Sequence, residues 1–284
     1  MAETGKVEAG LHLVAVPIGA ARDITLRALD ILRAAEVLAA EDTRSLRRLM
    51  DIHGIALDGR PLIPYHDRNG PEARPRLISA LRSGKSLAYM SEAGTPLVAD
   101  PGYQLAIAAR AEGIAVRAAP GASAVLAALC VAGLPTDRFL FGGFLPPKSA
   151  ARRTALTELA SVPATLVFYE SPKRLAAFLT DAAEVLGDRE TAICRELTKR
   201  FEEVRRGRLS DLAAEVAGET IRGEVVLVID RPAARVADAG AIRAALEIEM
   251  QSTSLKSAVK TVSESTGIAR NQVYEIALQI RRGD

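Results

Sequence analysis

The 284-residue sequence contains no tryptophan, and aromatic residues make up only 4% of it. Proteins that hold single-stranded nucleic acid by base stacking need several aromatic side chains on one surface, so the composition argues against that mode of binding. Cysteine is also scarce: Cys130 and Cys194 stand alone, without a paired spacing. This usage is typical of a reduced, cytoplasmic setting.

Long apolar runs and an excess of charge are absent as well. No run approaches the roughly 18 residues of a membrane-spanning helix, and the N-terminal MAETGKVEAG has no apolar segment of the kind found in signal peptides. We therefore expect no contact with a membrane. The net charge of +2 excludes a polybasic arm for nucleic acid but leaves room for a local basic patch.

Several catalytic and metal-binding motifs are missing. His12, His53 and His66 lie far apart, and neither cysteine has the spacing of a zinc ligand, so we expect no metal. The dinucleotide fingerprint, the Walker phosphate loop and the nucleophile elbow are not found. An S-x-x-K match at Ser257–Lys260 lies on an expected helix without partner motifs, which favours a solvated helix face.

What the sequence does contain is a regular alternation of short apolar runs with helical patterns, which predicts βαβ units and a mostly parallel sheet. In the first half, strands are expected at 11–16, 36–40, 61–65, 86–90 and 114–119, and helices at 25–34, 43–50, 72–83 and 103–112. Asp23 is expected to cap the first helix, and Asp100 followed by Pro101 the last.

The pattern restarts after Pro120-Gly121. Strands are expected at 139–144, 164–169, 191–197, 200–208 and 223–230, and helices at 122–132, 149–160 and 173–186. A Pro/Ala/Gly linker at 231–240 precedes three helices at 241–250, 254–264 and 270–281. The prediction is α/β: an N-terminal domain (1–119), a second α/β domain (120–232), and a linker with a small helical region (233–284).

Four turn-rich segments follow expected strands: VPIGAARD (16–23), AEDTR (40–44), SEAGTPLVADPGY (91–103) and PGASA (120–124). In an open α/β sheet, ligands bind in the crevice at the carboxyl ends of the strands. One such loop is usually structural, but four on one edge predict a site. Without a phosphate-binding motif, its ligand would be held by backbone amides and small side chains.

The second half is more polar. YESPKR (169–174) follows one strand, and RELTKRFEEVRRGRL (195–209) contains six basic and three acidic residues between Arg195 and Arg208. Two interpretations stay open: an edge strand protected by Lys and Arg, or a patch that contacts phosphates. The helical tail has a helix-turn-helix-like pattern, which serves either nucleic-acid contact or docking on a partner.

Taken together, LHLVAVPIGAARDITLRALDILRAAEVLAAEDTR, SEAGTPLVADPGY, PGASAVLAALCVAGLPTDRFLFGGFLPPK, FYESPKRL and RELTKRFEEVRRG resemble signatures of the small-subunit rRNA (cytidine-2′-O)-methyltransferase I family. They match in order from residue 11 to about 230. That family belongs to the tetrapyrrole-methylase-like, S-adenosylmethionine-dependent methyltransferases. The resemblance implies a homodimer of two-lobed subunits, with S-adenosylmethionine folded into the cleft between the lobes.

The implied reaction is 2′-O-methylation of a cytidine ribose in small-subunit (16S) ribosomal RNA near the decoding centre. Three positions depart from the family pattern: Ala20 stands where Asn is common, Glu92 where Asp is usual, and Lys173 where His is frequent. Ala20 removes any side-chain role there, and Glu92 keeps the charge but moves it by one methylene. Lys173 keeps a donor but is no histidine-type base near neutral pH.

A ribose hydroxyl is a weak nucleophile near neutral pH, so a nearby proton acceptor is expected to help. Glu92 and Glu170, at strand ends, are the candidates for that role, and Arg174 and Lys199 are candidates to neutralise neighbouring phosphates. By resemblance, the cofactor is expected to touch Ile18, Thr95, Val98, Ser123, Ala124 and Leu197. Gly94 and Gly223 would let the chain approach it closely.

Two other functions remain open from the sequence. One is a methyltransferase of the same fold that acts on a tetrapyrrole or another small molecule. The other is a non-catalytic ribosome-binding assembly factor, which would bind no methyl donor. The basic segment and the helical tail favour an RNA substrate within the small ribosomal subunit.

Overall fold

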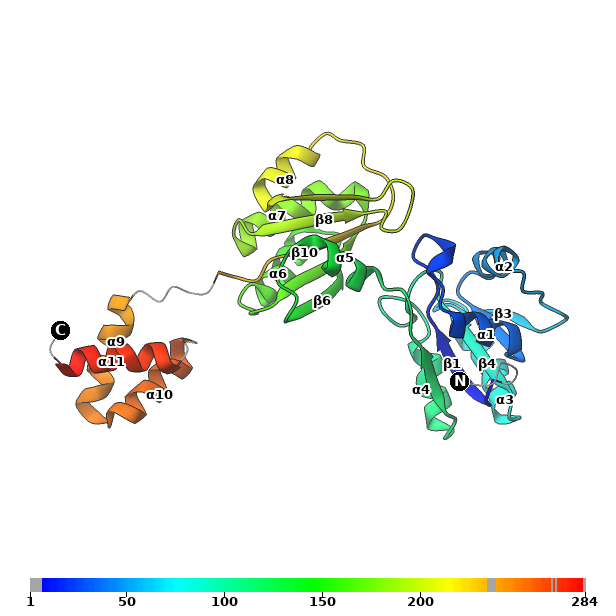
Figure 1. Cartoon of the computed structure of the whole chain (residues 1–284), viewed down its shortest axis with the longest axis horizontal. Coiled ribbons are helices and arrows are strands. Elements are labelled where there is room, and N and C mark those ends of the chain that lie inside the picture. Colours follow the sequence, from blue (N-terminus) through cyan, green and yellow to red (C-terminus); the bar gives the residue numbers. More distant parts are fainter. Residues whose placement is uncertain (1–6, 234–238, 267, 269, 283–284) are drawn as a thin grey trace. The chain divides into compact units, whose positions relative to one another are not determined.

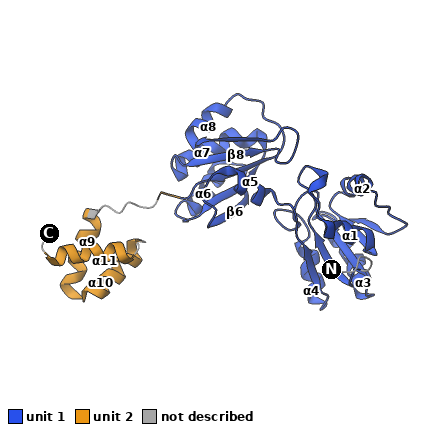
Figure 2. Cartoon of the chain, viewed as in Figure 1, with its two compact units in different colours: residues 1–231 blue, residues 232–284 orange. Residues whose placement is uncertain are grey.

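The computed structural model describes residues 7–233, 239–266, 268 and 270–282. Residues 1–231 form one compact unit and residues 232–284 a second, drawn in separate colours in Figure 2. Part of the expected linker, residues 234–238, lies outside the described residues, and the helix after it begins at Ala239.

The first lobe of the larger unit is built on a five-stranded parallel sheet with the strand order β3-β2-β4-β1-β5. Figure 1 labels β1, β3 and β4 of this sheet. Its strands are β1 (Gly10–Val14), β2 (Val37–Ala40), β3 (Leu62–Pro64), β4 (Ser86–Met90) and β5 (Val116–Ala119). Its helices are η1 (Ala21–Asp23), α1 (Leu26–Ala34), α2 (Thr43–Ile52), α3 (Gly70–Arg82) and α4 (Tyr103–Ala111).

Both faces of this sheet are buried because successive side chains point to opposite sides of a strand. In β2, Leu38 and Ala40 pack with α1 and α2, whereas Val37 and Ala39 pack with α3 and α4. A parallel sheet covered by helices on both faces needs such continuous apolar runs. The predicted βαβ alternation is confirmed.

The second lobe carries a mixed sheet with the order β6-β7-β10-β8-β9, in which β6 and β7 are parallel and the other pairs antiparallel. Its strands are β6 (Phe139–Phe144), β7 (Thr165–Glu170), β8 (Glu190–Arg195), β9 (Glu203–Arg208) and β10 (Val225–Ile229). Its helices are α5 (Ala124–Ala132), α6 (Ser149–Leu159), η2 (Pro172–Arg174), α7 (Leu175–Leu186) and α8 (Leu209–Val216).

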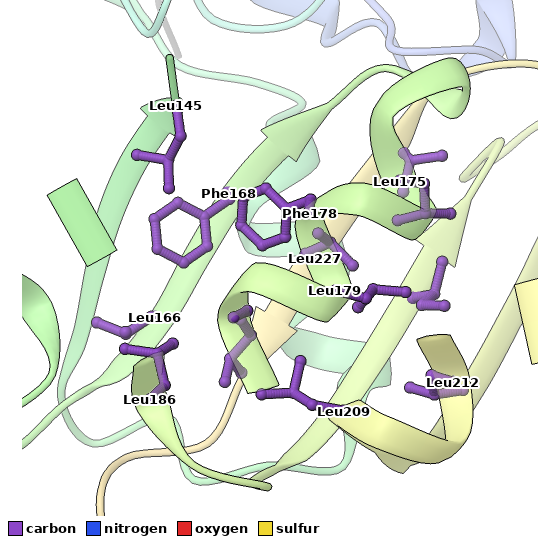
Figure 3. Close-up of a cluster of buried hydrophobic side chains, with 14 of the residues drawn as sticks. Leu145, Leu166, Phe168, Leu175, Phe178, Leu179, Leu186, Leu209, Leu212 and Leu227 are labelled. Atoms are coloured by element: carbon purple, nitrogen blue, oxygen red, sulfur yellow. The ribbon is translucent and has the colours of Figure 1, made fainter. Parts of the chain in front are cut away.

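The larger of this lobe's two cores lies between the sheet and α7. Figure 3 shows Phe168 of β7 beside Phe178 of α7, with their ring centroids 5.4 Å apart. Val167, the neighbour of Phe168, points to the other face and packs with Val125 and Leu129 of α5. Helix α8, which was not predicted from the sequence, adds Leu209 and Leu212 to the core between the sheet and α7.

Both expected helix caps in the first lobe are wrong. Thr25, not Asp23, caps α1, because its hydroxyl accepts the backbone amide of Ala28. Helix α4 begins at Tyr103 after Gly102, whose φ of 116° is left-handed, so Asp100 lies outside the cap position.

The second unit is a three-helix bundle of α9 (Ala239–Ser252), α10 (Leu255–Thr266) and α11 (Arg270–Arg282). Leu246, Val259, Val262 and Val273 form its buried centre. Among the described helices, none has the length and apolar content needed to cross a membrane. The predicted domain boundaries stay predictions; the first falls between β5 and α5, and the second lies next to the division after Arg231.

Candidate functional site

A cleft of about 390 Å³ lies at the strand ends of the larger unit and takes its lining from both lobes. Small and apolar groups predominate, with a few carboxylates and hydroxyls among them. The lining residues are Ile18, Ala93, Gly94, Thr95, Val98, Ala99, Asp100, Ser123, Ala124, Phe144, Tyr169, Glu170, Ser171, Pro172, Gly223, Glu224, Val225 and Val226.

Most of the site residues expected from the sequence lie in this cleft. They are Ile18, Gly94, Thr95, Val98, Ser123, Ala124, Glu170 and Gly223. Leu197 is buried beside Ile18 in a core cluster, and Lys199 and Arg174 hold cleft carboxylates in ion pairs. Glu92 lies in a different pocket.

The loop between β4 and α4 is fixed against the neighbouring strand ends. Gly94 and Val16 exchange two backbone hydrogen bonds, with N···O distances of 2.9 and 3.1 Å. The Thr95 hydroxyl donates to the Ala122 carbonyl at 2.9 Å. Gly94 has a φ of 70°, and a Cβ there would lie 3.2 Å from Ile18 Cγ2. A glycine is therefore what lets this bend sit against the cleft wall.

Further along the same loop, Leu97 and Ala99 adopt left-handed φ values of 73° and 60° on either side of Val98. Residues with a Cβ rarely adopt this conformation, which costs of order 1–3 kcal/mol per residue. The surrounding contacts must supply that energy. Such strain clusters at ligand sites, and Val98 and Ala99 both line the cleft.

A second strained loop follows β8. Glu196 and Thr198 have φ values of 51° and 64° on either side of Leu197. The Thr198 hydroxyl accepts the amide of Ala20 at 3.1 Å, and a Cβ at Gly19 would lie 2.6 Å from that hydroxyl. This loop therefore joins the two lobes beside the cleft.

Lys199 lies in a small charge network next to the cleft. Its Nζ donates to Glu196 and Glu224, each at 2.9 Å. Burial lowers the pKa of Lys199, but the two acceptors outweigh this effect and raise it overall. Gly223 has a φ of 95° and lies so close that a Cβ would come within 2.5 Å of the Glu196 side chain. In this structure Lys199 is therefore paired with protein carboxylates, whereas the sequence made it a candidate to neutralise phosphates.

Glu170 ends β7 with a fully buried side chain whose Oε2 lies 3.0 Å from an Arg174 guanidinium nitrogen. Its Oε1 accepts the Ser171 amide at 2.6 Å, and Arg174 also donates to the Leu145 carbonyl at 2.6 Å. No hydrogen bond reaches Oε2 from the residues that the structure describes. This buried oxygen borders the cleft with an acceptor position to spare.

Asp100 is a cleft residue that the sequence pattern presented as a helix cap. Burial raises its pKa to about 6, and the charges of Glu41 and Glu92 add to the effect. Its presence in the turn-rich loop 91–103 was visible in the sequence. Its position was not, because it depends on the left-handed turns at Ala99 and Gly102.

Aromatic side chains close one side of the cleft. Tyr169 makes edge-on contacts with Phe141 and Phe144, with centroid distances of 4.8 and 5.5 Å. Burial, with the charge of Asp100 next in importance, raises the pKa of Tyr169 to about 12. Phe144 lines the cleft yet remains 58% exposed. Tyr169 and Phe144 both belong to the family-like motifs, but the sequence pattern did not assign them to the site.

A second cavity of about 580 Å³, here called the acidic pocket, is lined by Glu41, Asp42, Thr43, Arg44, Pro64, His66, Asp67, Arg68, Glu92 and Pro101. The backbone amide of Glu92 donates to Glu41 at 3.1 Å. Arg44 hydrogen-bonds Asp42 and lowers its pKa to about 2. The cleft and the acidic pocket share the 91–102 loop, with Asp100 in the first and Glu92 and Pro101 in the second.

The basic segment 195–208 is largely paired. Arg195 binds Glu203, and Arg205 binds Glu203, Glu215 and Glu219. β9 is the edge strand of its sheet. These pairs favour the interpretation as a protected edge strand. No group of three or more potential metal ligands occurs among the described residues.

Comparison with known proteins identifies the family. Residues 10–213 match the family described as Tetrapyrrole (Corrin/Porphyrin) Methylases, and residues 236–281 match the RsmI C-terminal HTH domain. A Mesorhizobium japonicum protein named "Ribosomal RNA small subunit methyltransferase I" is 46% identical over 97% of this chain and 93% of its own length. A Micromonospora olivasterospora protein of the same name is 46% identical over 93% of this chain and 85% of its own.

A solved structure shows the same fold. Uroporphyrin-III C-methyl transferase from Thermus thermophilus, complexed with S-adenyl homocysteine, has a TM-score of 0.54 and 23% identity, covering 77% of this chain and 96% of that one. At this identity the likeness concerns the fold alone. The identity to the first two relatives extends over nearly the whole chain. The chain therefore belongs to the tetrapyrrole methylase family and, within it, to the ribosomal RNA small subunit methyltransferase I proteins.

Proposed function

We propose that this methyltransferase transfers the methyl group of S-adenosylmethionine to the ribose 2′-hydroxyl of a cytidine in small-subunit ribosomal RNA, within the small ribosomal subunit. The observation that carries the proposal is near full-length identity of 46% to a protein named for small-subunit rRNA methylation, combined with a cleft built for close backbone approach.

The cleft suits such a donor in shape and in its polar groups. A Cβ at Gly94 or Gly223 would crowd the neighbouring side chains, and Glu170, whose buried Oε2 accepts no hydrogen bond from the described residues, is among the lining residues. Ile18, Thr95, Val98, Ser123 and Ala124 would contact it, largely through backbone atoms. Leu197 would not touch the donor itself but would support the cleft wall by packing against Ile18.

When bound, the donor supplies an electrophilic methyl group on a positively charged sulfur. That charge disappears in the transition state, so an ionised carboxylate against the sulfur would favour the ground state. The cleft carboxylates Glu170 and Glu224 are held by Arg174 and Lys199 respectively, which limits that effect. The main contribution of the chain is alignment of hydroxyl and methyl, worth roughly 7–11 kcal/mol in favourable cases.

An RNA acceptor is favoured over a tetrapyrrole. The solved structures named for tetrapyrrole chemistry share only 18–23% identity with this chain, and a likeness at that level concerns the fold alone. The second unit also matches a domain described as helix-turn-helix. Binding to small subunits should therefore weaken as salt rises, since contacts to phosphates release counterions.

We also propose that the protein is a homodimer. Tyr103 and Ile107, one helical turn apart on α4, are 61% and 43% exposed. Exposed apolar side chains that adjoin one another, and so can form a contiguous patch, are a feature of interaction surfaces. Sedimentation of the wild type against Tyr103→Glu tests this: a dimer that the substitution splits supports it, and a wild-type monomer contradicts it.

Methyl transfer itself is tested with tritiated S-adenosylmethionine and small subunits that lack the modification, followed by nuclease mapping. Label on a cytidine ribose supports the function. Label on a base would refute the 2′-O assignment, and no label together with no donor binding in calorimetry would refute enzymatic methyl transfer.

A further inference from the structure

Phe144 is the one aromatic side chain of the cleft lining that is mainly exposed, among the residues that the structure describes. It is 58% exposed, whereas Ile18, another residue of the lining, is 8% exposed. Phe144 therefore lies at the rim of the cleft, where a second substrate arrives from solvent. Aromatic side chains stabilise a protein by burying their large surface, so an exposed ring at a cleft calls for an explanation.

An irregularity in β6 places Phe144 on the cleft side of its sheet. β6 pairs with β7 in regular register as far as Phe141 and then skips one residue, so that Phe144 pairs with Tyr169. Successive side chains of a regular strand point to opposite faces, which would separate Phe141 from Phe144. The extra residue instead places both on the face of Tyr169, whose ring centroid lies 4.8 and 5.5 Å from theirs. Bulges next to active sites re-aim side chains in this way.

Two glycines make this irregularity possible. Gly142 is left out of the pairing, and a Cβ there would lie 2.4 Å from Phe168 Cε1. Gly143 has a left-handed φ of 64°, which residues with a Cβ rarely adopt. The Phe-Gly-Gly-Phe sequence at 141–144 therefore determines where the Phe144 ring lies.

The ring has the chemistry of a platform for a nucleobase. Tyr169 contacts Phe144 edge-on, while more than half of the Phe144 surface stays open to solvent. Unstacked bases of RNA are bound by stacking on aromatic side chains, and one ring is enough for one base. The scarcity of aromatic residues argues against a series of stacked bases, but it leaves room for a single contact at the reacting nucleotide.

We propose that Phe144 is the stacking platform for the base of the acceptor nucleotide, a substrate-binding role that rests on the proposed function. Gly94, Ser123 and Ala124 hold the methyl donor in that scheme, and Phe144 receives the acceptor base at the rim. A base fixed on the ring also fixes the attached ribose. The platform therefore contributes to the alignment of the 2′-hydroxyl with the methyl group.

The test is a double-mutant cycle between the ring and the base. Small subunits are reconstituted with rRNA that carries either the target cytidine or an abasic ribose in its place. Their binding to the wild type and to Phe144→Leu is measured with S-adenosylhomocysteine, which occupies the donor site without reacting. In the wild type, removal of the base should weaken binding about 5- to 150-fold, the range that one base–aromatic stack supplies.

Phe144→Leu should bind intact subunits more weakly by a similar factor, and removal of the base should then cost it less than threefold. A wild-type loss below fivefold would overturn the proposal. So would a loss of threefold or more in Phe144→Leu, or binding of intact subunits at wild-type strength by that variant.

Donor affinity shows which base the ring serves. Calorimetry with S-adenosylmethionine should give affinities within threefold for the wild type and Phe144→Leu, which also shows that the variant is folded. A larger loss would mean that the ring stacks on the adenine of the donor, and the proposal would be wrong.

Two further variants separate the ring from its surroundings. Phe144→Tyr keeps an aromatic ring and should bind intact subunits as the wild type does, whereas binding as weak as that of Phe144→Leu would contradict a stacking role. Phe139→Leu is the matched control, because Phe139 begins the same strand, is 42% exposed and lies outside the cleft lining. It should match the wild type in every measurement, and a loss equal to that of Phe144→Leu would mean that any exposed phenylalanine of β6 has this effect.

The two proposals fail in different ways. If the wild type labels a cytidine ribose and the cycle shows no coupling between ring and base, the assignment of Phe144 is wrong and the function stands. If the wild type labels a base or no rRNA, the function is wrong, and the platform for this acceptor is wrong with it.

Discussion

The cleft and the acidic pocket share one loop, yet the pKa values of Asp42 in the acidic pocket and Asp100 in the cleft are shifted in opposite directions. In the acidic pocket, Arg44 bonds Asp42 and lowers its pKa to about 2. In the cleft, burial and like charges raise the pKa of Asp100 to about 6. A partnered carboxylate is fixed as an anion, whereas a buried one with acidic neighbours can exchange a proton near neutral pH. One short stretch of the molecule thus holds one carboxylate with a lowered pKa and one with a raised pKa.

The largest expected effect comes from breaking the buried pair at the cleft. Glu170→Ala leaves Arg174 without its anion, and removing one partner of a buried pair costs about 3–5 kcal/mol. Because Arg174 is 29% exposed, we expect about 3 kcal/mol of destabilisation in urea unfolding. Asp42→Ala in the acidic pocket should destabilise clearly less, since Arg44 is solvated. Equal losses of unfolding free energy in Glu170→Ala and Asp42→Ala would mean that the ion pair of the cleft stabilises the fold no more than that of the acidic pocket.

The next largest effect is expected from Gly94→Ala, which changes the backbone of the cleft loop. Gly94→Ala must keep a φ of 70° and bring a Cβ to 3.2 Å from Ile18, which costs about 1–2 kcal/mol. We expect donor affinity, measured by calorimetry, to fall about tenfold. Gly113→Ala is the matched control, because its φ is 69° and nothing lies within 4 Å of the new Cβ. It should lose similar stability but bind the donor as the wild type does. Equal affinities in the two variants would contradict a donor site at Gly94.

A smaller effect concerns stability and pH. The pKa of Asp100 is higher in the folded chain than in the unfolded one, so its contribution favours folding at low pH and is lost as pH rises through about 6. Asp100→Asn should match the wild type near pH 4 and exceed it by roughly 1 kcal/mol above pH 7, a figure reduced for partial exposure. Thermal melts across this range measure the difference. A variant that is less stable at pH 7 would contradict the buried-charge account.

The sequence predicted the parts of the site that depend on local pattern. SLAYM forms a buried strand, so the turn-rich loop 91–103 that follows it could be assigned to a crevice from the strand pattern. The choice of Thr95 and Val98 within that loop came from the family resemblance. Glu170 at the end of ATLVFYE followed from the same rule. In each case the position depends on where a strand stops, which apolar runs and turn residues report directly.

The rest depends on contacts between distant segments. Asp100-Pro101 has the local pattern of a cap, but Gly102, where a Cβ would clash with Tyr89, takes the cap position and α4 begins at Tyr103. The left-handed turns at Leu97 and Ala99 oppose local preference, so no pattern in the sequence could predict them. For the same reason Glu92 could not be assigned to the acidic pocket, nor Asp100 to the cleft.

The smallest expected effect is that of Glu92→Gln, which tests the proton-acceptor role expected for Glu92 from the sequence. Glu92 lines the acidic pocket, so its loss should change the single-turnover methylation rate at pH 8 by less than about threefold. A hundredfold slower rate at every pH would instead make Glu92 the proton acceptor expected from the sequence. If Glu92→Gln is slow at every pH and Glu92→Asp keeps the wild-type rate, the carboxylate at position 92 is needed and its extra methylene is not.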